Sequence, residues 1–304
     1  MTPPDSASGA TSGSAPSSAS VVDRLKTFAL APLPQHFLTR VVYALTRRQS
    51  RLVTPIIRRF AAHFKVDMQD AMQPNLEGYD TFNAFFTRAL KPQARPIATG
   101  ERVIACPADG RISAIGQVRD ARVLQAKGID YSLLDLLGGD GEATERLGDG
   151  SFVTVYLSPR DYHRLHMPAA GQLLSQTHVP GRLWSVGPHA VRALDGLFTL
   201  NERVVAQFDT EHGRMALVLV GAMNVAAIDT VWQGPVTPNS RSGITRKEYT
   251  SDESPTALER GAEMGRFNMG STIIALFEHP VEWDTSLQSE AAVLMGQALN
   301  AARM

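Results

Sequence analysis

The sequence predicts an α+β protein in which N-terminal helices precede a mainly antiparallel β core. Between residues 21 and 65, apolar side chains recur at helical spacing, with one break at Pro32-Leu33-Pro34. From residue 111 onward, short apolar and β-branched runs are separated by Gly and Pro, which is typical of strands joined by turns. The 304 residues are enough for one large domain or two modest ones.

The first region, residues 1–20, consists almost entirely of Ser, Ala, Pro, Gly and Thr, and Asp5 is its only charged side chain. Such a composition cannot bury enough apolar surface to offset the entropy of ordering the chain. We therefore expect a disordered tail. The segment also lacks the basic start and the apolar centre of a secretory signal.

The second region, residues 21–75, is expected to form short amphipathic helices. Its apolar positions are interspersed with arginines, at Arg40, Arg47, Arg48, Arg51, Arg58 and Arg59. Such helices can lie in the interface of an anionic bilayer, but helices packed on a protein core show the same pattern. No run reaches the roughly 20 apolar residues that a spanning helix needs, so we expect no transmembrane helix.

The third region, residues 76–304, is expected to form the core. A helix is predicted from Asp80 or Thr81 to just before Pro92, and a helical patch at 131–137. Strands are predicted at residues 103–105, 111–118, 152–157, 217–220, 225–228 and 273–277.

The composition narrows the classes of partner and of chemistry. Lys and Arg balance Asp and Glu at 30 each, which argues against nucleic acid as the main partner. The single cysteine, Cys106, excludes an internal disulfide framework and suits a reducing compartment. Because it stands between Ala105 and Pro107, we expect it to be a small buried side chain and not a nucleophile.

Three short motifs could supply an activated nucleophile. Ser271 lies in Gly270-Ser271-Thr272 directly before a predicted strand, Asp109 follows another strand, and His163 and His166 are three residues apart. An Asp, a His and a Ser that are distant in sequence but joined in space form the general arrangement for activating a hydroxyl. Two histidines can also serve two different proton transfers. We expect no metal, since an HExxH pattern and a second cysteine are both missing.

The chain resembles the bacterial phosphatidylserine decarboxylases, which are pyruvoyl enzymes made by self-cleavage of a proenzyme. Seven blocks carry the resemblance in the family's order, at residues 85–92, 107–110, 162–168, 179–186, 200–204, 220–226 and 261–272. Two positions depart from the family pattern. Met269 replaces the usual Leu before Gly270, a swap that costs little, and Arg260 stands where relatives often have Lys, which keeps the charge but changes its geometry.

The resemblance implies cleavage between Gly270 and Ser271 into a large chain, 1–270, and a small chain, 271–304. In the family an Asp-His-Ser triad drives this maturation, and by position its members are Asp109, His166 and Ser271. Ser271 would become the pyruvoyl group, and no other cofactor is implied. We expect His163 to be the proton donor in the later decarboxylation.

The implied activity is decarboxylation of phosphatidylserine to phosphatidylethanolamine and carbon dioxide, through a Schiff base between the serine amine of the lipid and the pyruvoyl group. The large and small chains would stay together as a heterodimer, because residues 273–277 form a strand of the core; further dimerisation is left open. A diacyl lipid leaves its bilayer at a cost of about 0.8 kcal/mol per methylene. We therefore expect a peripheral protein on the cytoplasmic side of the cell membrane, with residues 21–75 as the contact.

Two other classes of function remain open from the residues alone. The first is a serine hydrolase that uses Asp109, His166 and Ser271 on an external ester or amide, although no Gly-x-Ser-x-Gly motif surrounds Ser271. The second is a non-catalytic membrane-binding module with a β-rich core. An uncleaved chain that does not react with hydrazine or borohydride would favour this module.

Overall fold

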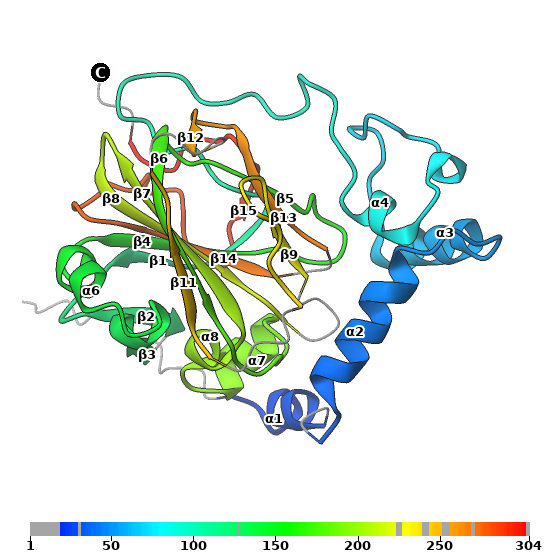
Figure 1. The fold of residues 1–304 in the computed structure, drawn as a ribbon, viewed down its shortest axis with the longest axis horizontal. Coiled ribbons are helices and arrows are strands. Elements are labelled where there is room, and N and C mark those ends of the chain that lie inside the picture. The colour runs from blue at the N-terminus through cyan, green and yellow to red at the C-terminus, as the bar shows by residue number, and fades with distance from the viewer. Residues whose placement is uncertain are drawn as a thin grey trace, which may run out of the picture.

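The computed structural model describes residues 19–29, 32–126, 128–222, 227–238, 243–250, 256–268 and 271–301. Figure 1 shows a β-rich core on one side and three N-terminal helices that run along its edge. Of the predicted tail, only Ala19 and Ser20 fall within the described residues. The protein therefore shows the expected α+β organisation, with helices first and a large antiparallel sheet after them.

The N-terminal helices are α1 (Val21–Phe28), α2 (Gln35–Thr46) and α3 (Val53–Phe64), as the periodicity predicts. Ser20 and Asp23 form a capping box that begins α1, and Pro34 directly precedes α2. None of the helices in the described ranges is both long and apolar enough to cross a bilayer.

The described residues contain a central sheet of nine strands with the order β11-β6-β7-β8-β14-β4-β1-β15, and β12 pairs with β6. Neighbouring strands are antiparallel throughout. The strands are β1 (Gly110–Gln117), β4 (Ser151–Tyr156), β6 (Gly171–Val179), β7 (Arg203–Thr210), β8 (Gly213–Val220), β11 (Thr245–Glu248), β12 (Ala257–Leu258), β14 (Thr272–Phe277) and β15 (Ala292–Val293).

A smaller sheet packs on one face of the central sheet. Its strands, in order, are β10 (Gly234–Pro235), β9 (Ile228–Thr230), β13 (Glu263–Phe267) and β5 (Arg164–His166). Leu165 and Phe267 of this sheet share one buried apolar cluster with Ile273 and Phe277 of β14. The two sheets thus enclose one half of the core.

The opposite face of the central sheet is covered by short helices and a hairpin (Figure 1). Ile274 and Leu276 of β14 face this layer, because side chains alternate along a strand. The layer consists of β2 (Arg122–Ala126), β3 (Ile129–Ser132), α5 (Leu133–Leu136), α6 (Gly141–Leu147), α7 (Pro188–Ala193) and α8 (Leu197–Leu200). β14 is therefore buried on both faces, which explains its continuous apolar sequence.

The connection from α3 to the central sheet contains a 3₁₀ turn, η1 (Leu76–Gly78), and α4 (Phe82–Phe86). Phe82, Phe85 and Phe86 pack against Val53 and Ile57 of α3 in a third apolar cluster. α4 is thereby joined to the N-terminal helices by packing.

Most predicted strands are confirmed, by β1, β4, β8 and β14, although β8 already begins at Gly213. The predicted strand at 103–105 is wrong, since Ala105 forms only an isolated bridge with Ala298. The strand predicted at 225–228 appears as β9 from Ile228 onward, and residues 225 and 226 lie outside the described residues.

Two helix predictions need correction. The helix expected up to Pro92 ends at Phe86, because Leu90 pairs with Ala71 and Lys91 donates to the Asp70 carbonyl. The helical patch expected at 131–137 is shorter, since residues 131 and 132 belong to β3 and the side chain of Ser132 caps α5. A contact with a distant segment decides the first boundary, whereas the local Ser132 cap decides the second.

Candidate active site

The expected site residues gather at one edge of the central sheet. β1 and β14 begin at this edge and β4 ends between them, with Tyr156 opposite both Arg111 and Thr272. Asp109 directly precedes β1, and Ser271 directly precedes β14. Because neighbouring strands lie about 4.8 Å apart, the main chains at Asp109 and Ser271 are separated by about 10 Å.

Ser271 is completely buried at the start of a central strand. Its carbonyl accepts a hydrogen bond of 2.9 Å from the Leu157 N–H, and β14 then pairs with β4 on one side and β8 on the other. The alternation of side chains places Ser271 on the face of Ile273, toward the smaller sheet. Gly270 and Met269 lie outside the described residues. The main chain at position 271 is thus held from its carboxyl side by the sheet itself.

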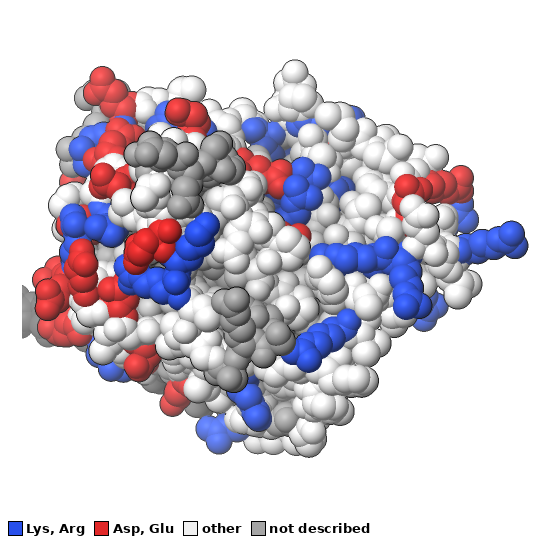
Figure 2. Space-filling model, in the orientation of Figure 1, with Lys and Arg blue, Asp and Glu red and all other residues white. Residues whose placement is uncertain are grey.

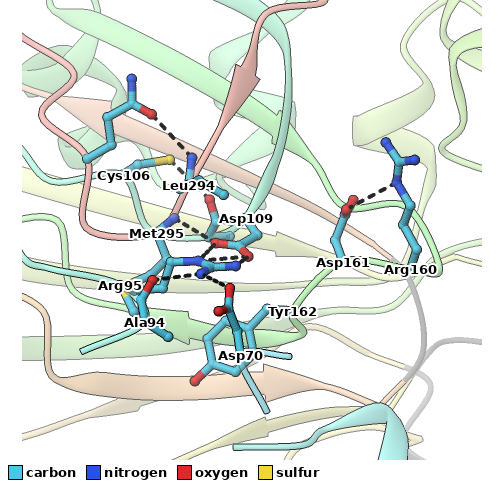
Figure 3. Close-up of polar contacts among 12 residues, drawn as sticks. Asp70, Ala94, Arg95, Cys106, Asp109, Arg160, Asp161, Tyr162, Leu294 and Met295 are labelled. Atoms are coloured by element: carbon cyan, nitrogen blue, oxygen red, sulfur yellow. Dashed lines mark hydrogen bonds and ion pairs between the residues drawn. The ribbon is translucent and has the colours of Figure 1, made fainter. Parts of the chain in front are cut away.

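The carboxylate of Asp109 is almost fully buried and bound by Arg95 (Figure 3). Arg95 donates from Nε at 2.9 and 3.0 Å and from Nη2 at 2.6 Å, while its Nη1 reaches Asp70 at 2.7 Å. The Met295 N–H donates a further bond of 2.8 Å to Asp109. The hydrogen bonds that Arg95 donates to Asp109 raise the pKa of Arg95 above its usual value.

Gly110, the next residue, must be glycine because the chains approach closely here. A Cβ at this position would lie 2.3 Å from the Tyr156 carbonyl oxygen. This explains the Asp-Gly pair that follows Ala108, and it draws the Asp109 loop against the end of β4.

His166 lies on β5, and its N–H donates to the Pro107 carbonyl at 2.9 Å, beside the Asp109 loop. Its Nδ1 lies 2.8 Å from the Gly261 carbonyl, which can only accept, so Nδ1 carries the proton. Nε2 then accepts from the Tyr162 hydroxyl at 3.0 Å. Burial lowers the pKa of His166 below its usual value. The ring is therefore a neutral base with its lone pair on Nε2.

His163 occupies a dry position against α4. It is completely buried, stacks on Phe86 with ring centroids 4.1 Å apart, and its Nε2 lies 3.1 Å from the Ser158 carbonyl. Burial first, and the nearby charge of Arg88 second, lower the pKa of His163 to about 3. Its Nδ1 has no hydrogen-bond partner in the described part of the chain. At neutral pH this imidazole is uncharged.

The chain matches the family model described as phosphatidylserine decarboxylase over residues 82–301, and a second model, described as PSD, over residues 25–65. This chain belongs to the phosphatidylserine decarboxylase family. It is 49% identical to the phosphatidylserine decarboxylase proenzyme of Alkalilimnicola ehrlichii over 86% of this chain and 90% of the relative. The proenzyme of Pseudomonas aeruginosa is 48% identical over 91% and 96%, and that of Methylococcus capsulatus 47% identical over 89% and 94%.

Membership of this family settles the activity. The protein is a decarboxylase that converts phosphatidylserine to phosphatidylethanolamine. The serine-hydrolase and binding-module alternatives are thereby set aside. Family membership also places the enzyme among membrane-associated proteins.

In the decarboxylase, the expected triad residues share one sheet edge but bond to other groups. Asp109 is bound by Arg95 and Met295, and the two ring nitrogens of His166 contact Gly261 and Tyr162. Sequence reasoning overlooked Arg95 and Tyr162. Tyr162 stands inside a family block, four residues before His166, whereas Arg95 gives no local signal because it lies 14 residues from Asp109.

A cleft of about 320 Å³ opens beside these residues. Asp109, Tyr156 and Tyr162 line this cleft together with Lys65, which follows α3. The cleft therefore connects the reactive sheet edge with the N-terminal helices. Cys106 is buried nearby, and burial raises the pKa of its thiol to about 12, which confirms its expected inert role.

Proposed function

We propose that this decarboxylase matures by cleaving its own chain between Gly270 and Ser271, and that residue 271 becomes a pyruvoyl group. The position of Ser271 supports the proposal most strongly. Its carbonyl is bound to Leu157 and its strand pairs on both sides, so the small chain would stay in the sheet after cleavage. The names of the relatives, which are proenzymes, agree with this reading. The two chains would then form the proposed heterodimer.

The surroundings of position 271 fit a carbonyl-containing group. Nδ1 of His163 is buried without a hydrogen-bond partner in the described ranges. His163 reaches this region because its Nε2 contacts Ser158, which follows the Leu157 that binds Ser271. Because Nε2 faces the Ser158 carbonyl, Nδ1 carries the lone pair and can accept a hydrogen bond from the substrate amine, while the complete burial of Ser271 shields a ketone at this position from water.

For maturation we propose Asp109, His166 and Ser271 as the reacting groups. His166 Nε2 would take the hydroxyl proton of Ser271 after Tyr162 releases this nitrogen, and the oxygen would attack the Gly270 carbonyl. The peptide C–N bond breaks, the proton passes to the leaving nitrogen, and an ester remains. Removal of the Ser271 α-hydrogen then breaks the Cβ–O bond of residue 271 and releases Gly270 as a free carboxylate. Water hydrolyses the enamine that remains, so the nitrogen of residue 271 leaves as ammonia and a ketone takes its place. Asp109 would favour the imidazolium form of His166, on which its charge acts in the folded protein.

The pyruvoyl group supplies a ketone that takes the substrate amine and an electron sink for the pair released with carbon dioxide. The chain's own residues must then bind the headgroup, exclude water and deliver one proton. We propose His163 for the proton transfer, because it is completely buried and its Nδ1 is without a partner in the described part of the chain. The stack on Phe86 holds its ring in one orientation.

We further propose that residues 21–75 place the enzyme on the cytoplasmic side of the cell membrane. Large apolar side chains on these helices are exposed, at Val21, Val22, Leu25, Phe28, Phe37, Val41, Leu45, Leu52 and Ile56. Figure 2 shows that the charged side chains over α2 are blue, whereas both signs mix over α6 and β8. Apolar and basic side chains on one surface suit an anionic bilayer. The cleft at Lys65 would then face the lipid headgroups.

The intact mass under denaturing conditions tests the self-cleavage. We expect two chains, residues 1–270 and 271–304, with the small chain blocked at its N-terminus and shifted in mass by borohydride. The Ser271→Ala variant serves as the control and should remain one full-length chain. A single full-length chain for the wild type, in protein that decarboxylates phosphatidylserine, would overturn the proposal.

A further inference from the structure

Arg88 is a buried cation that forms no ion pair with a carboxylate in the described residues. Arg88 is only 4% exposed, and burial lowers the pKa of its guanidinium. In the described part of the chain it bonds only to main-chain oxygens, from Nη2 to Arg160 at 3.0 Å and to Asp161 at 3.4 Å. Its Nε is buried and has no partner there. A buried charge in this state is costly unless an anion completes the site.

Arg88 lines the cleft that leads to the reactive sheet edge. Another arginine of the cleft, the partly buried Arg95, is already paired with Asp109 and Asp70. Asp161 accepts from both the N–H and the hydroxyl of Ser158, which directs its carboxylate into its own turn. The buried positive charge left over in this cleft is therefore that of Arg88.

The substrate brings two anionic groups into the cleft, a phosphodiester and the carboxylate that is lost. A guanidinium bound to the carboxylate would stabilise the ground state and oppose the loss of carbon dioxide. The phosphodiester keeps its charge throughout the reaction, and guanidinium matches its oxygens with paired donors. We infer that Arg88 binds the phosphodiester of the phosphatidylserine headgroup and so positions the serine moiety toward residue 271.

The test compares two serine compounds that share amine and carboxylate, of which one contains phosphate. Mature wild type, Arg88→Gln and Arg88→Lys are incubated with glycerophosphoserine or with O-acetyl-L-serine, and cyanoborohydride traps the amine on the small chain for mass measurement. Arg160→Gln, an exposed arginine of the same cleft, is the matched control. This readout rests on the pyruvoyl group proposed above.

For Arg88→Gln we expect the half-saturating concentration of glycerophosphoserine to rise roughly 10- to 100-fold, since a charge-assisted hydrogen bond is lost. The value for O-acetyl-L-serine should change less than about twofold, and Arg88→Lys should fall between wild type and Arg88→Gln. Equal losses for both compounds would show that Arg88 only supports the turn at Arg160, and the inference would be wrong.

Two other outcomes are also decisive. If both Arg88 variants remain full-length chains, the residue serves folding or maturation and the inference is overturned. If even the wild type traps neither compound, the pyruvoyl proposal fails instead. The KM for short-chain phosphatidylserine, which depends only on the family's activity, then decides the role of Arg88: an increase in the Arg88 variants that Arg160→Gln does not share supports it, and an unchanged KM refutes it.

Discussion

At the scale of single residues, the two histidines have different environments although they lie three positions apart. His166 is a neutral base whose tautomer is set by the Gly261 carbonyl. His163 is sealed against Phe86. The spacing indicated two proton-transfer groups, and the resemblance suggested which step each serves. Neither could reveal that Tyr162 occupies Nε2 of His166, because this contact depends on how β5 meets the preceding turn.

We predict that His166→Ala and His163→Ala separate the two steps. His166→Ala should slow maturation by about 10²- to 10⁴-fold, the usual contribution of a general base, and remain full length. His163→Ala should cleave but lose decarboxylation by a similar factor. Denaturing mass measurement and release of carbon dioxide are the two readouts. The exposed His279, which lies elsewhere, provides the control, and His279→Ala should be normal in both. A fully mature His166→Ala enzyme would remove the role assigned to His166.

The low pKa of His163 also predicts how stability depends on pH. The unfolded chain binds a proton near the ordinary pKa of 6.5, whereas the folded chain does so only near pH 3. Between these values the unfolded state holds more protons, so the free energy of unfolding falls as pH falls. The slope from this residue is about 1.4 kcal/mol per pH unit.

Denaturant unfolding of uncleaved Ser271→Ala protein at several pH values checks this slope. His163→Phe in the same background keeps an aromatic ring against Phe86 and should have a shallower dependence. Identical slopes for the two proteins would contradict the buried, neutral state of His163.

At the scale of elements, strand β14 and helix α4 illustrate what local pattern can and cannot predict. The run at 273–277 is apolar throughout, and the structure buries both of its faces, so pattern and structure agree. α4 ends early because Leu90 pairs with Ala71, a partner far outside any local window. The same reason hides the contact between Arg95 and Asp109. Periodicity reports burial, whereas it does not report which distant segment supplies the neighbour.

The exposed apolar face of α2 predicts membrane binding. Replacing Phe37 and Leu45 with Ser should weaken binding to anionic liposomes at least about tenfold, since each large apolar side chain contributes about 1.5–3 kcal/mol when buried. Co-sedimentation measures the bound fraction. Leu134→Ser removes an exposed apolar side chain from α5, and this variant should bind like wild type. Deletion of residues 1–50 should release the protein from the liposomes. Undiminished sedimentation of the Phe37 and Leu45 variant, or of the deletion variant, would count against this membrane contact.

At the scale of the whole molecule, the sheet edge at which β1 and β14 begin lies beside the cleft, and together they form the candidate active site. Three of the sequence blocks contribute Arg88, Asp109 and Tyr162 to the cleft, and only the fold shows that Tyr156 separates Arg111 from Thr272. The blocks are short and far apart, so their meeting follows from the strand order β14-β4-β1. That order could not be derived from spacing, because antiparallel sheets allow many orders for the same strands.

We predict that the mature chains remain together under native conditions. Residues 271–301 contribute β14 at the centre of the sheet and β15 at its edge, so most of their contacts are with the large chain. Size-exclusion chromatography in high salt should give one peak that contains both chains, because buried apolar contacts are not screened by ions. Separation without denaturant would show that the sheet does not hold the small chain.

Because β14 lies at the centre of the sheet, we expect folding to precede the proposed cleavage. Before cleavage, this strand finds its place within one chain, at the high effective concentration that a covalent tether provides. After the proposed cleavage before Ser271 this tether would be gone, and a denatured enzyme would have to reassemble from two separate chains, at a rate that depends on their concentration. We therefore expect the denatured precursor to refold more readily than the denatured, cleaved enzyme.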